Sequence, residues 1–450
     1  MSSGWKRFHD SSLHPAPLPC PNPNADDASP SPPCVGVLLE KKAYITDRCD
    51  HTTAYCVTRD GGHIHATFVL AAPPAVSYLC VSSTTELGRE PSVRATNADL
   101  ALLFSIRGFP NNHLRPNTHD YYVYQYQADD HGTGAGRPSL MLLPQPLHDL
   151  FPCLCTRGYY FDDRQTGIMR YRTGAGASAF LVAALCIYDY IGDTPLALYT
   201  YDSETNASSC RPASFPDGQL PESAYRCHKV ITVGGEDGTM GWVDLLGGII
   251  VCDVLPVNGT EARLLRYIPM PPPIRESNDL HDSVSMYRDV AVVGGRIRYV
   301  EVQMNVSPGT DRRRRNGWTA VTWSISTADS SWRKEHEVHA HEISNSLHAC
   351  DSNSVVPGFE LLPTLQGHNG VIQPTLERLH VGHPKLGLRE DDHIVYLMAK
   401  VDHRLDEAWV IAVDMKNKRL RGVAEFAGAQ RRFSFVNSYD PSEISEYISQ

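Results

Sequence analysis

The sequence predicts an all-β protein of the β-propeller type, with about seven sheets arranged around an axis. Three observations lead to this prediction. Short runs of β-branched and aromatic residues recur after residue 33, glycine pairs or polar turns separate them, and helical periodicity is nearly absent. The chain has 450 residues, more than one hydrophobic core usually serves. Radial repetition of four-stranded sheets would supply several small cores and protect the strand edges, whereas a β-sandwich or a pair of barrels is the competing architecture.

The first 33 residues are expected to form a disordered tail, and residues 34–450 a single propeller-like domain. Prolines at positions 15, 17, 19, 21, 23, 30, 32 and 33 remove backbone donors and favour extended, solvated chain. A polyproline recognition ligand is the functional alternative for this tail. The tail lacks the apolar segment of a secretory signal, and the longest apolar run, residues 179–187, is far shorter than a membrane-spanning helix of ~20 residues. We therefore expect a protein of the cytoplasm, the nucleus or both, without a membrane partner.

The predicted strands pair as hairpins wherever two runs flank a tight turn. The pairs are 54–58 with 63–70, 242–246 with 249–253, 289–293 with 296–302, and 408–415 with 419–426. Three polar segments interrupt this pattern and predict surface loops: 128–137, 203–222 and 307–316. A short helix is predicted after Asp440, with Asp440 as the N-cap, Pro441 at the first helical position and Glu443 at the third.

The charge of the chain argues against nucleic acid as a partner. The formal charge is -10 and the sequence pI is about 6.0, so a polyphosphate backbone would meet net repulsion. The run from Arg312 to Arg315 could serve as a nuclear import signal or a phosphate contact, but in a Gly- and Pro-flanked loop it is interpreted as solvated charge. The 12 cysteines are read mostly as buried thiols, and the glycosylation sequons at Asn206, Asn258 and Asn305 as chance matches.

Searches for nucleotide and acyl-transfer motifs predict no cofactor and no catalytic residue. The glycines at 132, 134 and 136 resemble the start of a dinucleotide fingerprint but lead toward a strand instead of a helix. No phosphate-binding GxxxxGK[ST] loop occurs. The segment nearest to a GxSxG nucleophile elbow is Gly176, Ala177 and Ser178, which lacks the second glycine.

Two His-x-His pairs are the strongest candidates for a metal site. His63 with His65, and His339 with His341, would each point to one face of a strand. No HExxH motif, paired CxxC or nearby cupin-like glutamate completes either pair, so no metal is predicted. The acidic turn before His393 is interpreted as structural.

Aromatic residues cluster in strand-like contexts, where they could line either a core or an interaction surface. The tyrosines at 121, 122, 124 and 126 fit both interpretations. The tryptophans at 242, 318, 323, 332 and 409 are predicted to fill the cores of the sheets.

The chain resembles a large plant family, expanded in grasses, called domain of unknown function family 1618. The stretches that carry the resemblance run in order through the chain: 73–81 (PPAVSYLCV), 119–126 (HDYYVYQY), 228–255, 265–273 (LRYIPMPPP), 287–302, 317–324 (GWTAVTWS) and 391–415. The resemblance implies a propeller-type β protein and supplies no reaction or catalytic residue. The loop 132–137 and the arginine run depart from the family pattern, so the resemblance implies surface contacts that differ among members.

We therefore expect a protein-interaction module without catalytic activity that binds a still unknown protein partner. A propeller offers a rigid rim and a face covered by loops, both suited to binding a protein. The sequence shows no group of neighbouring residues that forms a recognisable catalytic motif. The alternative is a hydrolase or lyase that gathers acids and histidines from several sheets at a central channel.

Overall fold

The structure is a computed structural model that describes the chain in nineteen segments. They are residues 10–14, 36–108, 118–127, 136–144, 163–174, 176–186, 196–216, 225–234, 238–255, 262–274, 284–306, 315–329, 331–349, 356–366, 372–374, 376–391, 393–402, 405–426 and 438–448. The predicted all-β class is confirmed, because strands dominate and the described helices are short: α1 (Asp10–Leu13), α3 (Ala340–Ala349) and α4 (Ile444–Ile448). Among these residues, no helix has the length and apolar character needed to span a membrane.

Six sheets, numbered here 1 to 6, follow one another along the chain. Sheet 1 has the order β28-β1-β5-β4-β3, with the short β2 (Tyr44–Ile45) paired to β5, and sheets 2 to 6 are four-stranded antiparallel meanders. The strands of sheet 1 are β1 (Val37–Glu40), β3 (Ala54–Val57), β4 (His63–Val69), β5 (Val76–Ser83) and β28 (Tyr439–Ser442).

The meanders of sheets 2 to 4 have the following bounds. Sheet 2 is β6 (Ser92–Asn97), β7 (Leu100–Ile106), β8 (His119–Gln127) and β9 (Arg137–Leu142). Sheet 3 is β10 (Thr166–Arg172), β11 (Ser178–Cys186), β12 (Leu196–Asp202) and β13 (Ala207–Ser214). Sheet 4 is β14 (Lys229–Gly234), β15 (Thr239–Asp244), β16 (Gly248–Asp253) and β17 (Arg263–Pro269). The edge strands β13 and β17 pair in parallel, which joins sheets 3 and 4 and covers two exposed edges.

The second half of the chain forms sheets 5 and 6 with a small hairpin between them. Sheet 5 is β18 (Arg288–Val293), β19 (Arg296–Val306), β20 (Arg315–Ile325) and β21 (Arg333–His339). Sheet 6 is β24 (His380–Leu386), β25 (Ile394–Lys400), β26 (Trp409–Asp414) and β27 (Arg419–Glu425). The hairpin of β22 (Thr364–Gln366) and β23 (Ile372–Pro374) comes between them in the chain.

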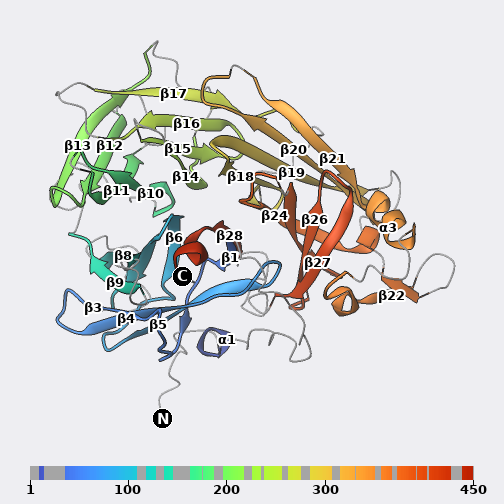
Figure 1. Ribbon diagram of the computed structural model, residues 1–450, viewed down its shortest axis with the longest axis horizontal. Coiled ribbons are helices and arrows are strands. Elements are labelled where there is room, and N and C mark those ends of the chain that lie inside the picture. The colour runs from blue at the N-terminus through green and yellow to red at the C-terminus, as the bar shows by residue number, and fades with distance from the viewer. Residues whose placement is uncertain are drawn as a thin grey trace.

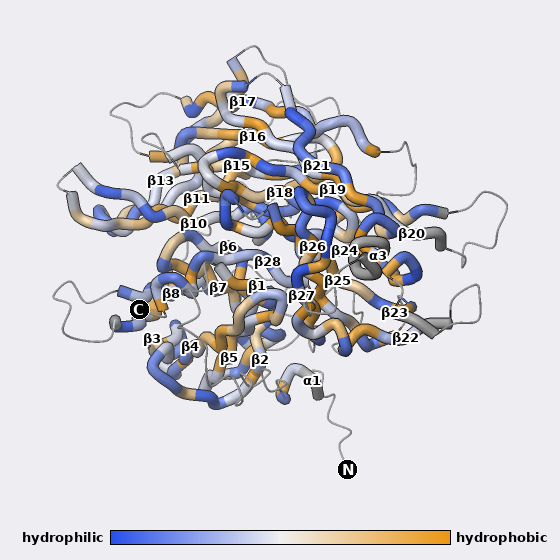
Figure 2. Tube along the Cα trace, turned by 45° about the vertical axis from the view of Figure 1, so that its right-hand side comes forward, coloured by the Kyte–Doolittle hydropathy of each residue, from blue (hydrophilic) through white to orange (hydrophobic). Residues whose placement is uncertain are grey.

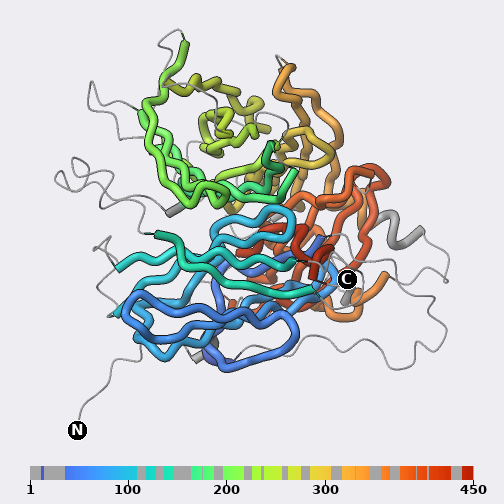
Figure 3. Tube along the Cα trace, turned by 60° about the vertical axis from the view of Figure 1, so that its left-hand side comes forward, coloured from blue at the N-terminus to red at the C-terminus, as the bar shows by residue number. Residues whose placement is uncertain are grey.

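The six sheets lie around a common centre, with the first strands of sheets 2 to 6 and β28 of sheet 1 innermost (Figure 1). The inner strand β10 contacts β6 and β14, β18 contacts β14 and β24, and β24 contacts β28. Viewed from the side, the sheets of the first half of the chain lie as successive layers (Figure 3). The first and last strands of the chain pair with each other, since Val37 lies opposite Ser442 and Glu40 opposite Tyr439. The ring of sheets is thus closed by the two ends of the described chain.

A separate hydrophobic core lies between each pair of neighbouring sheets. Sheets 3 and 4 enclose Trp242 with Leu181 and Leu198, and sheets 5 and 6 enclose Trp318 with Ile411 and Val395. The core between sheets 6 and 1 contains Leu38, Met398, Val410, Phe426 and Tyr439. Hydrophobic residues accordingly recur along the strands of adjacent sheets, as Figure 2 shows. This division into small cores explains how 450 residues fold without one very large interior.

Ion pairs between sheets add polar contacts to these cores. Asp120 of β8 accepts from Arg59 Nε at 2.8 Å and lies 2.5 Å from Arg107 Nε, which ties sheet 1 to sheet 2. Arg170 of β10 donates through Nε to Asp99 Oδ1 at 2.8 Å, which ties sheet 3 to sheet 2.

The predicted hairpins are confirmed by strand pairing. The clearest case joins β18 to β19, where Gly294 and Gly295 have φ values of 57° and 71°. A two-residue turn of this kind needs positive φ at both central positions, which glycine adopts at least cost. The tryptophans at 242, 318, 323 and 409 are buried as predicted, and the four tyrosines of β8 are core residues.

Other sequence-based expectations differ from the structure. The predicted count of about seven sheets is not confirmed, because the described residues form six.

Residues 207–214 of the predicted loop 203–222 form β13, whose pairing with β12 and β17 outweighs its polar composition. The loop predicted at 307–316 ends earlier, because Arg315 begins β20 and pairs with Val306. Within the tail predicted for residues 1–33, Asp10–Leu13 form α1, and the hydroxyl of Ser12 donates to Glu90.

The C-terminal helix is present but begins later than predicted. Asp440 and Pro441 belong to β28, where they pair with Leu39 and Leu38. The helix α4 starts at Ile444, whose backbone N–H donates to Ser442 Oγ at 3.3 Å. Asp440 is therefore not an N-cap, because strand pairing at the closure of the ring takes precedence over the local capping pattern.

Candidate functional site

A cavity of about 170 Å³ lies where the inner strands of the sheets meet. Its lining comes from the end of β1, from β6, β14, β18 and β28, and from the short 3₁₀ turn Asp163–Gln165 that precedes β10. The polar and charged lining residues are Lys41, Arg94, Thr96, Asn97, Arg164, His228, Lys229, Thr232, Asp440, Ser442 and Glu443. We call this the central cavity.

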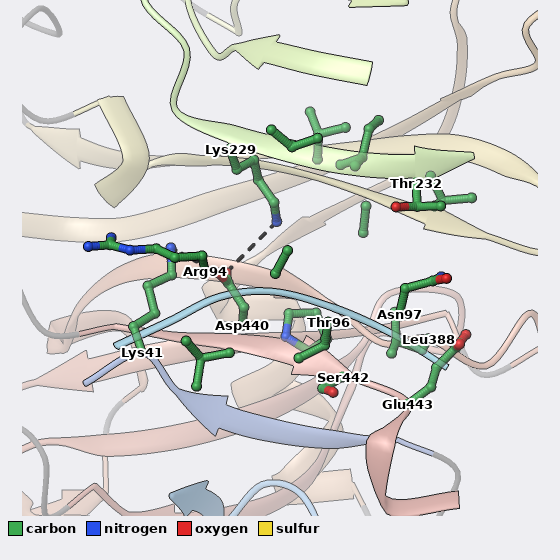
Figure 4. Close-up of a pocket in the computed structure, with 18 of the residues that line it drawn as sticks. Lys41, Arg94, Thr96, Asn97, Lys229, Thr232, Leu388, Asp440, Ser442 and Glu443 are labelled. Atoms are coloured by element: carbon green, nitrogen blue, oxygen red, sulfur yellow. Dashed lines mark ion pairs between the residues drawn. The ribbon is translucent and has the colours of Figure 1, made fainter. Parts of the chain in front are cut away.

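Three lysines and two aspartates from different sheets converge beside the central cavity. Lys41 follows β1, Lys229 opens β14, Asp289 lies in β18, Lys385 in β24 and Asp440 in β28. We call these five residues the lysine–aspartate cluster. Figure 4 shows Lys229 reaching across the cavity toward Asp440, with Lys41 and Arg94 nearby.

Asp440 is the carboxylate that all three lysines share. Its Oδ2 lies 2.8 Å from Lys41 Nζ, and its Oδ1 lies 2.8 Å from Lys385 Nζ and 3.8 Å from Lys229 Nζ. Asp289 Oδ1 accepts from Lys229 at 3.1 Å and lies 3.2 Å from Lys385 Nζ. The side chains of Lys385 and Asp289 are 5% and 2% exposed, so this part of the cluster is buried. Charged side chains are almost never buried without such partners.

A bulge in β24 accompanies the placement of Lys385. The register between β24 and β25 shifts between Gly382 and Lys385, and His383 within the bulge has φ 47°. Because a bulge changes which way the following side chains point, it can direct the Lys385 side chain inward.

The pKa values in the cluster record the balance of burial and charge. Burial would raise the pKa of Asp440, but the charges of Lys385, Lys41 and Lys229 hold it well below its usual range. Burial would lower the pKa of Lys385, but Asp289 and Asp440 raise it. At Lys41 burial dominates, aided by repulsion from Lys385 and Lys229, and the pKa is lowered despite the attraction of Asp440. Lys41 is therefore the cation that the cluster compensates least.

Positive side chains outnumber carboxylates around the cavity. Lys41, Lys229, Arg94 and Arg164 line it, against Asp440 and Glu443. Burial and the neighbouring Glu446 raise the pKa of Glu443. Burial lowers the pKa of His228, which favours its neutral form. A chain of net charge -10 thus concentrates positive charge at its centre, and such a site attracts anions.

The sequence-predicted candidates lie elsewhere. The imidazoles of His339 and His341 stack with centroids 5.5 Å apart, and His339 Nδ1 lies 3.0 Å from Thr319 Oγ1. His63 and His65 lie on β4, where His65 contacts Asp47 and Cys49. His393 Nδ1 lies 3.2 Å from His336 Nε2, at the turn before β25.

The remaining motif candidates give no site. The segment at Gly176 and Ser178 is the turn between β10 and β11, where Thr173 and Ala177 are hydrogen-bonded. Gly136 precedes β9, while Gly132, Gly134, Arg312 to Arg314 and Asp392 lie outside the described residues. Of the described cysteines, Cys80, Cys186, Cys227 and Cys252 are buried, as expected, whereas Cys49 and Cys210 are exposed.

Sequence reasoning missed every member of the lysine–aspartate cluster. The available signal was a charged residue inside or beside an apolar strand, as at Asp289 before VAVV and Lys385 within HVGHPKLGL. Such a charge must be paired if it is buried, but the partner cannot be named from strand periodicity, because it comes from a different sheet.

These features define an all-β protein whose sheets surround a cavity rich in positive charge. Residues 242–396, from β15 into β25, match the model of the family described as protein of unknown function (DUF1618). The resemblance seen in the sequence is thereby confirmed.

Comparisons with other proteins add no function. No curated protein matches the chain significantly. Among solved structures, a GDP-Man-dependent mannosyltransferase from Leishmania mexicana is 8% identical over 74% of this chain and 83% of its own, with a TM-score of 0.23. A tail fibre of a Staphylococcus aureus phage is 7% identical over 87% of this chain and 95% of its own, with a TM-score of 0.14. These TM-scores are too low to indicate a common fold.

Proposed function

We propose that this protein is a six-bladed β-propeller that acts as a protein-interaction module, and that its central cavity receives an anionic group of the partner. The observation that carries the proposal is the convergence of Lys41, Lys229 and Lys385 on Asp440 at the cavity. The partner is a protein rather than a nucleic acid or a membrane. The cavity volume of about 170 Å³ suits a carboxylate or phosphate group and excludes a duplex backbone.

An incoming anion would stabilise the positive charge of Lys41 more than that of any other lysine in the cluster. Its side chain is 38% exposed and lines the cavity, and Asp440 is the only carboxylate that the described contacts place against it. A bound anion would supply a second negative partner and a charge-assisted hydrogen bond, which is stronger than a neutral one. The other two lysines hold Asp440 in place, so the site is organised before the ligand arrives.

Inorganic phosphate is the first probe of this site. We expect phosphate to raise the melting temperature of the protein and to bind in calorimetry, with Lys41→Gln weakening binding about tenfold through loss of one charge-assisted hydrogen bond. Lys418→Gln is the matched control, because Lys418 pairs with Glu342 at the surface, away from the cavity. Equal phosphate binding by the two variants would contradict the assignment of the cavity.

Partner capture tests the protein-interaction part of the proposal. Tagged protein purified from its native tissue should retain the same partners with Lys418→Gln but lose them with Lys41→Gln, as read by mass spectrometry. Removal of the residues before Cys34 should leave capture unchanged, since the cavity is built from later residues. Partners that bind Lys41→Gln as well as the natural chain would place recognition on another surface.

We propose that the encounter takes place in the cytoplasm or the nucleus. Cys49, Cys56, Cys186 and Cys252 are free thiols, as a reducing compartment would keep them. A fluorescent fusion observed in living cells tests this location directly.

Catalysis by a hydrolase or lyase is the second candidate, and one observation favours it. The pKa of Lys41 is lowered and that of Glu443 is raised in the same cavity, which is the pattern of an acid–base pair tuned toward neutral pH. An enzyme would show turnover that Glu443→Gln abolishes while phosphate still binds. A binding module would show no turnover in either form.

A further inference from the structure

A second cluster lies apart from the central cavity, on the solvent-facing side of sheet 1. His65 of β4 projects toward the loop before β3, where Asp47 and Cys49 lie. His65 Nε2 lies 3.2 Å from Asp47 Oδ1 and 3.7 Å from Cys49 Sγ, and all three ligand atoms fall within 4.8 Å of one another. A carboxylate, a thiol and an imidazole therefore face one point in space.

Two of the three ligand separations match those around a tetrahedral zinc ion, and the third, between Cys49 Sγ and the Asp47 carboxylate, falls within 4.8 Å. With Zn–S of about 2.3 Å and Zn–N and Zn–O of about 2.1 Å, a tetrahedral centre places sulfur about 3.6 Å from nitrogen and nitrogen about 3.4 Å from oxygen. The observed distances are 3.7 Å and 3.2 Å. Each is within a few tenths of an ångström of the value that the metal would impose.

The same imidazole nitrogen faces both partners, which argues against a catalytic relay. In a nucleophile–histidine–carboxylate triad the thiol and the carboxylate occupy opposite ring nitrogens. Here Nε2 alone lies next to Asp47 and Cys49, and a single N–H cannot serve both well. A divalent cation bonded to Nε2, Sγ and Oδ1 would satisfy all three groups together.

The loop that carries Asp47 and Cys49 is held on both sides. Before it, the backbone N–H of Thr46 donates to Val81 O at 3.2 Å, and within it Arg48 O accepts from the Thr67 hydroxyl at 2.7 Å. After it, Asp50 Oδ1 accepts from the backbone N–H of Thr52 at 2.8 Å, while Thr52 Oγ1 accepts from the N–H of Phe68 at 2.9 Å. A site fixed in this way pays little conformational entropy on binding.

Tyr55 provides a supporting contact to the thiol. It lies opposite His65 in the β3–β4 pairing, and its hydroxyl donates to Cys49 Sγ at 3.6 Å. Outer contacts of this kind orient metal ligands and tune their donor strength.

We propose that Asp47, Cys49 and His65 bind a zinc ion. The mixed sulfur, nitrogen and oxygen donor set suits Zn²⁺, and three protein ligands leave a fourth position for water or for a ligand atom of a bound partner. Cys49 is exposed and the Asp47 side chain is 82% exposed, so that position opens to solvent. This site is independent of the central cavity.

Cobalt substitution of the full chain tests the site. After chelation and dialysis, Co²⁺ alone should produce the near-ultraviolet sulfur-to-metal absorption and the visible bands of a tetrahedral centre, with one ion bound per chain, and Zn²⁺ should displace it. Cys49→Ser should remove the sulfur-to-metal band, and His65→Gln should weaken Zn²⁺ binding at least about tenfold.

Matched controls separate this site from the other thiols and histidines. Cys210→Ser removes another exposed thiol, and His63→Gln removes the neighbouring imidazole of β4, so both should leave the cobalt spectrum unchanged. Tyr55→Phe should keep the sulfur band while weakening Zn²⁺ affinity by up to about tenfold. Circular dichroism of each metal-free variant establishes that it is folded. A spectrum that survives Cys49→Ser, or that disappears with Cys210→Ser, would overturn the assignment.

Discussion

Replacing Trp242 by alanine is expected to lower the free energy of unfolding by about 4 kcal/mol, among the largest effects of any single substitution in this chain. The indole is fully buried between sheets 3 and 4, where it packs with Leu198, Ile250 and Leu265. Its Nε1 also donates to the backbone oxygen of Gln165 at 2.7 Å. Alanine would leave a large cavity and a carbonyl without this donor, and both effects reduce stability. Urea denaturation at 25 °C measures the change.

Two further variants separate packing from hydrogen bonding at this position. Trp242→Phe retains most of the aromatic volume and should cost about half as much, chiefly through the lost donor and the smaller ring. Trp332→Ala is the matched control, because Trp332 is only partly buried, at the edge of the core between sheets 4 and 5. A loss for Trp242→Ala no greater than that for Trp332→Ala would contradict the described core.

Replacing Asp440 by asparagine is expected to cost about 3 kcal/mol at neutral pH, because it removes the carboxylate shared by three lysines. The buried Lys385 would keep only Asp289, and Lys41 would face an amide. Removing one partner of a buried ion pair leaves the other charge uncompensated, and this accounts for most of the lost stability. Denaturant titration of both forms gives the difference.

The double variant Asp440→Asn with Lys385→Met should recover much of this loss, since it removes the stranded charge along with its partner. Asp329→Asn is the control for carboxylate removal, because Asp329 forms an exposed ion pair with Arg296 and should change stability little. If Asp440→Asn behaves like Asp329→Asn, the cluster does not contribute to the folded state as described.

The pH dependence of the same variant follows from the lowered pKa of Asp440. In the folded protein the pKa of Asp440 lies well below that of an ordinary aspartate. At pH values between these two pKa values, the unfolded chain therefore binds more protons than the folded chain. The stabilisation is present above about pH 4, the ordinary aspartate pKa, and is lost as the pH falls through the folded pKa. The gap between the natural chain and Asp440→Asn should therefore narrow under acid, and an unchanged gap at low pH would argue against this carboxylate as its source.

The class of fold and the pairing of its hairpins could be predicted from local patterns. Alternating apolar residues around Gly294 and Gly295 specify a tight turn between two strands, and the turn needs nothing beyond its own residues. The burial of Trp242 and Trp318 follows equally from strand context. The number of sheets could not be predicted from local patterns. β28 joins β1 from the far end of the chain, and no local signal marks such a pairing.

The candidate sites escaped prediction for the same reason. Asp440, Pro441 and Glu443 satisfy the rules for a helix start, yet pairing of β28 with β1 places Asp440 in a strand, among lysines from three other parts of the chain. His65 was recognised as a possible ligand, but next to His63, whereas its contacts are Asp47 and Cys49 across a loop.

The amino-acid sequence by itself determined the paired strands, their turns and the residues available for chemistry, because these depend on neighbours within about ten positions in the chain. Only the tertiary structure decided how many sheets close the ring, and that Lys41, Lys229, Lys385, Asp289 and Asp440 meet beside its central cavity. Lys229, Asp289, Lys385 and Asp440 lie in inner strands, and Lys41 follows β1, which pairs with β28. The inner strands of separate sheets come together only when the ring closes. The lysine–aspartate cluster is therefore a property of the closed ring, since no single segment of the chain holds more than one or two of its side chains.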